Sequence, residues 1–330
     1  MKMCRFIFVL TTFVLVITSC AIKKPFDLVL LPDTQTYSRA IPEIFQAQTA
    51  WIAANADSIA FVLHQGDITD WNVPEEWEVA AKAMQVMDGK VPYTFVPGNH
   101  DMGSEPGAKH FADSRQTDLF NNYFPYEKYS RMENFGGAFE EGKMDNTWHT
   151  FKAGGYDWLI LSLEFGPRNS VIEWAGKVVS DHPRHKVIIN THAYLYADDT
   201  HMSEKRNHHW RPQSYKLGKE TGDNAVNDGE QMWEKLVSRY PNILLVFSGH
   251  VLHDGTGFLV SDGLHGNKVY QMLANYQGGV ENAVKGGNGF LRRLTINPVE
   301  KKITVKTYSP FVDEYKTEPD QQFVIEHVDF

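Results

Sequence analysis

Short apolar runs rich in Val, Ile and Leu recur along the chain, and polar residues follow each of them. Such runs, about four to eight residues long, are typical of strands buried on both faces of a sheet. The runs that predict strands are residues 26–31, 59–63, 93–96, 157–163, 186–190 and 243–247.

Stretches with helical spacing lie between several of these runs, at residues 41–56, 75–87 and 229–239. Repeated alternation of strand and helix predicts an α/β fold. After Gly257 the pattern changes, and only strand-like segments follow, at residues 258–261, 269–273, 290–296 and 303–308. We therefore expect the last part of the chain to form a β layer.

Two long polar stretches interrupt this pattern, residues 196–228 and the glycine-rich residues 277–289. Loops of this length inside a compact domain are usually functional or disordered. The first of them holds His201, His208, His209 and Trp210, which predicts either a lid over a substrate or an ordinary solvated loop.

Composition narrows the possible classes of protein. The chain has 330 residues, of which 42% are hydrophobic and 22% charged, so it can bury a sizeable core and is not a low-complexity sequence. Its formal net charge of −9 disfavours binding to a nucleic-acid backbone, and we expect no nucleic-acid partner. The only cysteines are Cys4 and Cys20, so any metal must be held by His, Asp, Asn or similar groups.

The first twenty residues indicate export. Two basic residues precede the apolar run 6–17, which has the length of a signal-peptide core and is short for a membrane span of about 20 residues. The run ends in Ile-Thr-Ser-Cys at residues 17–20, which resembles the lipobox of bacterial lipoproteins. The resemblance implies a signal peptide at 1–19, a lipidated Cys20, a short tether at 20–25 and a protein anchored to a membrane in the bacterial periplasm or at the cell surface. An uncleaved anchor or an ordinary signal peptide remains the alternative.

Polar side chains with metal-binding chemistry follow five of the predicted strands. Ligands of α/β proteins bind beyond the carboxyl ends of the strands, where the loops converge. One such group could be a turn or a cap, because Gly-Asp and Gly-Asn pairs are common in turns. Five groups at one sheet edge have the composition of a site for a pair of divalent metals. The groups are Asp33-Thr34-Gln35, Gly66 to Asp70, Gly98 to Asp101, Thr191-His192, and Ser248 to His253.

These groups resemble the signature of the calcineurin-like metallophosphoesterase superfamily, which runs D-x-H, G-D-x-x-D, G-N-H-[DE], a single His and G-H-x-H. The second and third blocks match without exception, and their order along the chain agrees. The first block has Gln35 where His is usual, and in the last block His253 comes one position late. The resemblance implies a four-layer α/β/β/α sandwich of two packed mixed sheets over residues 26–310, with residues 311–330 packed on it as an extension.

The resemblance also implies a ligand set for two divalent ions, which could be Mn, Fe, Zn or Mg. Asp67 would bridge both ions, because a carboxylate has two oxygens. Asn99, His192 and His250 would complete the site of one ion.

Asp33 and Gln35 would hold the other ion together with Asp67, and His253 would be its fourth ligand if the loop bulges. An amide oxygen in place of an imidazole nitrogen predicts weaker binding of zinc-like metals. A merely structural amide at Gln35 and a non-ligand role for His253 are the alternatives.

The same resemblance assigns proton chemistry to His100, which would protonate the leaving oxygen or stabilise the transition state. Asp101 would orient His100, and Asp70 would brace the loop that carries Asp67. Two ions about 3.5–4 Å apart activate a water for in-line attack on phosphorus.

The expected activity is therefore hydrolysis of a phosphate ester, either a monoester or a diester. Two other functions remain open at this point. The departures at Gln35 and His253 allow a metal-binding scaffold that has lost turnover, although the pair His100-Asp101 argues against it because binding alone needs no acid. A nuclease of the same superfamily is disfavoured by the negative charge.

Overall fold

The structure is a computed structural model that describes residues 23–330, and the chain enters its first sheet at β1 (Phe26–Leu31). The predicted signal peptide and Cys20 lie outside the described residues, as do residues 21 and 22 of the predicted tether. Within the described part, no helix has both the length and the apolar character needed to cross a membrane.

The first sheet is mixed, because β1 pairs in parallel with β2 and antiparallel with β11. Its strands, in spatial order, are β13 (Glu314–Lys316), β12 (Lys302–Ser309), β11 (Leu291–Asn297), β1, β2 (Ile59–His64) and β3 (Tyr93–Thr94), with β14 (Gln322–Ile325) also paired to β12. Residues 311–330 thus contribute two strands to this sheet.

The second sheet is also mixed. Its central strands β6, β7, β8 and β10 run parallel, and antiparallel strands flank them at both sides. The spatial order is β4 (Phe135–Ala138), β5 (Thr147–Ala153), β6 (Tyr156–Leu163), β7 (Lys186–Thr191), β8 (Ile243–Ser248), β10 (Lys268–Ala274) and β9 (Thr256–Asp262).

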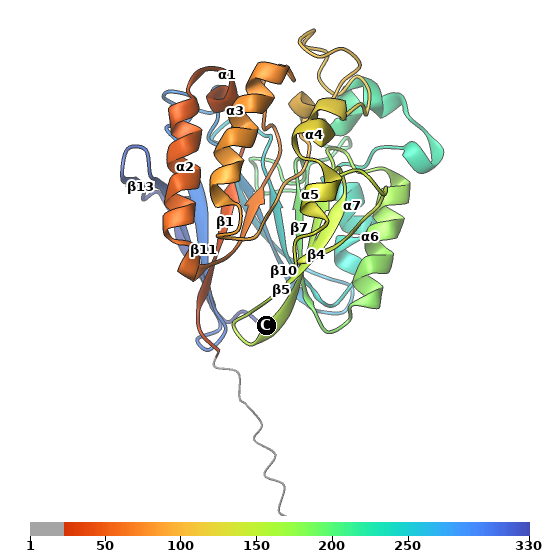
Figure 1. Ribbon diagram of the computed structural model, residues 1–330. Coiled ribbons are helices and arrows are strands. Elements are labelled where there is room, and N and C mark those ends of the chain that lie inside the picture. The colour runs from red at the N-terminus through yellow and green to blue at the C-terminus, as the bar shows by residue number, and fades with distance from the viewer. Residues whose placement is uncertain (1–22) are drawn as a thin grey trace, which may run out of the picture.

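Helices cover the outer faces of the two sheets (Figure 1). The side of the first sheet carries α1 (Gln35–Ala40), α2 (Pro42–Ala54), α3 (Pro74–Met84), α4 (Asp118–Tyr123) and α5 (Tyr126–Tyr129). The side of the second sheet carries α6 (Asn169–Asp181) and α7 (Gly229–Lys235). Short 3-10 helices lie at Ala56–Ser58, Gln85–Met87, Asn99–Asp101, Pro212–Ser214, Lys216–Lys219, Gly222–Asn224 and Val237–Arg239.

The alternation of side chains along buried strands produces the layers. In β1, Leu28 and Leu30 point into the core between the two sheets, whereas Val29 and Leu31 pack under the helices of the first sheet. The side chains of β6 alternate in the same way, with Ile160 in the core between the sheets and Leu159 and Leu161 under the helices of the second sheet. Because both faces of both sheets are buried, the fold is a four-layer α/β/β/α sandwich, and the fold class predicted from the sequence is confirmed.

Every strand predicted from an apolar run is present, but some elements were missed or misplaced. Strand β3 is shorter than predicted, because only Tyr93 and Thr94 pair with β2. The predicted helix at 229–239 ends its α-helical part at Lys235 and continues as a 3-10 turn. The expected β layer after Gly257 is divided, since β9 and β10 join the second sheet while β11 and β12 join the first.

Helix α6 was missed although its sequence carries a signal. Its buried residues Val171, Ile172, Ala175, Val178 and Val179 follow the spacing of one helical face. The helix lies between two parallel strands, β6 and β7, which need such a crossover connection.

A candidate metal centre at the carboxyl ends of the strands

The structure brings the expected strand-end residues together at one edge of the sandwich. Asp33 follows β1, Asp67 follows β2, Asn99 follows β3, His192 follows β7 and His250 follows β8. All of these side chains are buried. The edge therefore collects ligands from both sheets at one place between them.

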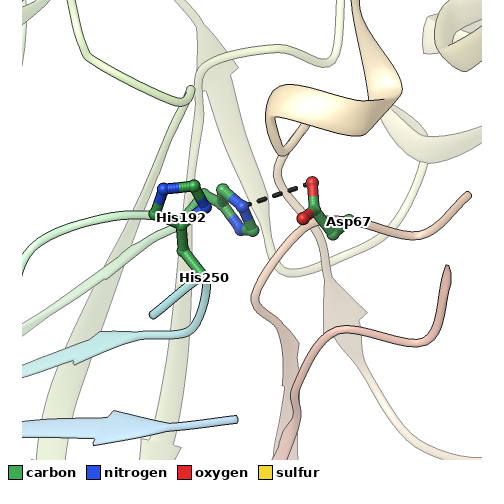
Figure 2. Close-up of side chains that lie close together, drawn as sticks. All are labelled: Asp67, His192 and His250. Atoms are coloured by element: carbon green, nitrogen blue, oxygen red, sulfur yellow. Dashed lines mark ion pairs between the residues drawn. The ribbon is translucent and has the colours of Figure 1, made fainter. Parts of the chain in front are cut away.

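The tightest group consists of Asp67, His192 and His250, whose possible ligand atoms all lie within 4.8 Å of one another (Figure 2). Nε2 of His192 is 3.2 Å from Oδ1 of Asp67 and 3.1 Å from Oδ1 of Asn99. Two imidazoles, a carboxylate and an amide oxygen form a donor set that suits a divalent metal such as zinc, iron or manganese.

Backbone carbonyls fix the orientation of both imidazoles. Nδ1 of His192 lies 2.7 Å from the carbonyl oxygen of Gln65, and Nε2 of His250 lies 2.7 Å from the carbonyl oxygen of Trp210. A nitrogen that donates to a carbonyl carries the proton, so the other nitrogen of each ring has a free lone pair. Histidine ligands of metals are usually held in this way.

The carboxylate of Asp33 faces the same group from β1. Both of its oxygens accept a hydrogen bond from the backbone N–H of His250, at 3.2 and 3.1 Å. The pKa of Asp33 is raised to about 7, because burial and the negative charge of Asp67 outweigh the lowering effects of the imidazole of His192 and of the backbone hydrogen bonds. Two buried carboxylates beside each other are stabilised by a bound cation.

The side chain of Gln35, the first residue of α1, is buried beside this group. Its Nε2 donates to Oδ1 of Asp70 at 3.3 Å, and its Oε1 has no hydrogen-bond partner among the residues that the structure describes. A buried polar atom without a partner is rare and needs an explanation. An amide oxygen left free in this way fits a cation, and the residues present fit the expected metal site.

His253 does not join the group of Asp67, His192 and His250 in the described part of the chain. Its Nε2 lies 2.9 Å from the hydroxyl of Tyr196, and its ring packs against Trp210 with the ring centres 5.2 Å apart. The loop of residues 196–228 therefore contacts His253 through Tyr196 and Trp210. The carbonyl of Trp210 also holds the ring of His250.

His100 lies beside the candidate metal centre, and its contacts differ from those expected. Nδ1 of His100 lies 2.7 Å from the carbonyl oxygen of Asp70 and 3.3 Å from Oδ1 of the same residue. Burial lowers the pKa of His100, but the charges of Asp67 and Asp70 outweigh this effect and raise it to about 9. Its ring stacks on Phe111 with 3.9 Å between ring centres.

Asp101, which we expected to orient His100, instead braces the loop of Asp67. Its carboxylate accepts hydrogen bonds from the backbone N–H groups of Ile68, Thr69 and Gly98, at 3.0, 2.9 and 2.9 Å. Asp70, which we expected to brace that loop, is the residue that contacts His100. The two expected roles are therefore exchanged, because Asp101 points back toward its own loop and the preceding one.

The glycines of the motifs allow the loops to approach one another. A Cβ on Gly66 would lie 2.7 Å from Nδ1 of His192, and one on Gly249 would lie 2.5 Å from Oδ2 of Asp33. Asp67 and His250 themselves adopt left-handed backbone angles, with φ of 47° and 73°. Such conformations are costly for residues with side chains and are concentrated at functional sites.

Sequence reasoning missed several groups that support the centre. The carbonyls of Gln65 and Trp210 leave no mark in the sequence, because any residue has a carbonyl. Arg39, whose guanidinium forms an ion pair with Asp70, carried a usable signal. It lies four residues after Gln35 on α1, which places both side chains on one face of the helix.

Comparison with known proteins identifies the class of protein. The family model for calcineurin-like phosphoesterases matches residues 27–254, which is more than half of the chain. The chain therefore belongs to the calcineurin-like phosphoesterase family, a family of phosphoesterase hydrolases that typically bind two metals.

One curated relative is the uncharacterized protein YvnB of Bacillus subtilis, which is 29% identical to the chain over 304 residues. The match covers 88% of the chain and 20% of YvnB, so the chain spans about a fifth of that relative's length.

A solved structure shares the fold at low sequence identity. Purple acid phosphatase PPD1 from yellow lupin (Lupinus luteus) has a TM-score of 0.53 and 14% identity, and the match covers 92% of this chain and 54% of the lupin protein. GAP50, the anchor in the inner membrane complex of Plasmodium, has a TM-score of 0.45 and 11% identity, with coverage of 92% and 91%.

Proposed function

We propose that the protein hydrolyses a phosphate ester at a centre that holds two divalent ions. The observation that carries the proposal is the buried group of Asp67, His192 and His250, with His100 beside it. The backbone N–H of His100 donates to Oδ1 of Asp67 at 2.9 Å, so the main chain of His100 is tied directly to the candidate ligand.

The first ion would be held by Asp67, Asn99, His192 and His250. The free nitrogen of each imidazole and the amide oxygen of Asn99 supply neutral donors, and Asp67 supplies charge. Divalent ions at such a site supply Lewis acidity toward the phosphoryl oxygens and toward the attacking water.

The second ion would be held by Asp33, Gln35 and Asp67. The unpartnered Oε1 of Gln35 supports this assignment. Nε2 of His253 is held by the hydroxyl of Tyr196, so its Nδ1 would be the nitrogen that binds an ion while this contact is kept.

His100 would serve as the acid for the leaving oxygen. Its Nδ1 is held by the carbonyl of Asp70, which leaves Nε2 to carry a proton to or from the substrate. Phe111 covers one face of the ring and restricts its rotation. A positioned acid of this kind contributes about 10²–10⁴ in rate.

The experiment that tests the proposal is metal removal followed by reconstitution of the purified protein with Mn, Fe, Zn or Mg, one ion at a time. Each form is assayed with a chromogenic phosphate monoester and with a diester, and its metal content is measured. We expect turnover of at least one substrate with at least one ion. Stoichiometric metal uptake without turnover under every condition would instead favour a metal-binding scaffold, which the position of His253 makes a real alternative.

We also propose that the protein is exported and anchored through a lipidated Cys20. The support is the lipobox-like sequence at residues 17–20. Lys23 donates to the hydroxyl of Tyr156 at 3.1 Å, at the start of β6, so the chain enters the fold at the edge opposite the metal centre. An anchor there leaves the centre uncovered. Cys20→Ser should move the exported protein from the membrane fraction to the soluble fraction, and unchanged membrane association would contradict lipidation at this residue.

A further inference from the structure

Trp71 lies at the rim of the candidate metal centre and holds two cations over its ring. It directly follows Asp70, and 36% of its surface is exposed. The guanidinium of Arg39 lies 5.1 Å from the ring centre, and the ammonium of Lys109 lies 4.3 Å from it. A cation placed over a tryptophan in this way is stabilised by the negative face of the ring.

Arg39 connects this pair of cations to the candidate metal centre. It lies one helical turn after Gln35 on α1, and residues so spaced have Cβ atoms about 5–6 Å apart. Asp70 accepts a hydrogen bond from Nε2 of Gln35 and also pairs with one nitrogen of Arg39. The guanidinium is therefore held in place and keeps donors for a further acceptor.

Lys109 connects the same pair to His100. The backbone N–H of Gly107 donates to the carbonyl of Trp71 at 2.9 Å, which fastens this segment to the tryptophan. Two residues after Lys109, Phe111 stacks on the imidazole of His100. The segment therefore lies against the ring of His100, and it carries an exposed ammonium two residues away.

Within the described residues, the protein pairs only one of the two cations with a carboxylate. Among residues 23–330, no carboxylate forms an ion pair with Lys109, and Arg39 pairs with Asp70 alone. The chain as a whole carries a formal charge of −9, so two cations held together on one ring stand out from their surroundings. Held cations with free donors beside a phosphate site are suited to a second anionic group.

We propose that Arg39 and Lys109 on Trp71 form an anion subsite, and that the substrate is a phosphate ester whose leaving group carries a second anionic group such as another phosphate. The assignment rests on the proposed function, since it places the leaving group beside His100. The subsite would select phosphate esters with a second anionic group from among the monoesters and diesters.

The test compares the binding of two non-hydrolysable ligands to the metal-reconstituted full chain by isothermal titration calorimetry. Propane-1,3-bisphosphonate can reach the subsite with its second group, whereas propylphosphonate has no second group. We expect the wild-type protein to prefer the bisphosphonate, and Lys109→Met to reduce that preference by about tenfold, equivalent to about 1.4 kcal/mol. Trp71→Leu should reduce it in the same direction, because both cations lose the surface that holds them.

Lys306→Met is the matched control, since Lys306 is an exposed lysine on β12 that lies 5.7 Å over the ring of Tyr315. We expect this variant to keep the wild-type preference. An unchanged preference in Lys109→Met, or an equal loss of affinity for both ligands, would overturn the subsite. A protein that shows the Lys109-dependent preference but hydrolyses no ester would retain the subsite and contradict the proposed function, so the two failures are distinguishable.

Discussion

The two halves of the candidate metal centre are supported in different ways. The histidine half, which comprises Asn99, His192 and His250, has both imidazoles fixed by backbone carbonyls. In the glutamine half, which comprises Asp33, Gln35 and His253, the backbone N–H of His250 holds Asp33. The other two residues depend on side-chain contacts, Gln35 with Asp70 and His253 with Tyr196. Asp67 lies between the halves.

This difference shows which half has its ligands oriented before a metal binds. The carbonyl of Gln65 directly follows β2, and that of Trp210 lies in the loop of residues 196–228. A backbone partner does not rotate as a side chain does, so a metal meets the imidazoles of the histidine half already oriented. Side-chain partners can rotate, so Gln35 and His253 are held less firmly than the two imidazoles of the histidine half. We therefore expect tight binding in the histidine half and weaker binding, with a preference for ions that favour oxygen ligands, in the glutamine half.

The largest effect is expected for the residue that the two halves share. Asp67→Ala should remove both ions and lower turnover on the order of 10⁴-fold or more, because the Lewis acidity of the ions is lost with them. Metal content after dialysis, measured by mass spectrometry, and turnover should fall together. Asp157→Ala, which removes an exposed carboxylate paired with Lys152, is the control and should change neither quantity. Retention of one ion by Asp67→Ala would show that one half binds without the shared carboxylate.

A smaller loss is expected when the metal ligands are kept and the acid is removed. His100→Ala should retain both ions and lower kcat by about 10²–10⁴-fold. The loss should be greater for an alkyl phosphate than for a nitrophenyl phosphate, because a poor leaving group depends more on protonation. The two esters are compared in steady-state assays at saturating metal. An equal loss on both would contradict the assignment of His100 as the acid.

The free energy of unfolding should distinguish the role of Asp101 from that of Asp70. Asp101→Asn leaves backbone N–H groups of Ile68, Thr69 and Gly98 with a poorer acceptor, so the free energy of unfolding should fall by about 2–3 kcal/mol. Urea unfolding of the metal-free protein measures this loss. Asp70→Asn should cost less stability and should change turnover through His100 instead. Equal free energies of unfolding for the two variants would contradict a special role of Asp101 in holding the loop of Asp67.

Much of the fold could be predicted from the sequence because buried parallel strands leave a continuous apolar signal. Strand β1 was predicted with its observed bounds for this reason. The meeting of Asp33, Asp67 and His192 could also be predicted, since strand direction places their loops at one edge. Helix α6 shows that a signal can be present and still be missed, although only residues 164–168 separate it from β6.

The contacts between loops could not be predicted in the same way. Spacing gives the position of Asp101 relative to His100, but it does not give the direction of a side chain in a turn. Asp101 accepts from the backbone N–H groups of Ile68 and Thr69, which follow Asp67 with its left-handed backbone, and residue spacing does not encode this contact. The position of His253 depends likewise on Tyr196, a residue 57 positions away.

The smallest effect, about tenfold, concerns Gln35 and tests the comparison of the two halves most directly. Gln35→His replaces an unpartnered amide oxygen by an imidazole, so the glutamine half should bind zinc about tenfold more tightly, while affinity in the histidine half stays the same. Competition titration with a chelator of known affinity resolves the weaker site from the tighter one. Gln48 offers a matched control, because it is also buried with an unpartnered Oε1 but lies on α2 and donates to the carbonyl of Phe290. Gln48→His should leave both affinities unchanged. If Gln35→His also left them unchanged, the free oxygen of Gln35 would have no part in holding an ion, and the glutamine half would rest on Asp33 and Asp67 alone.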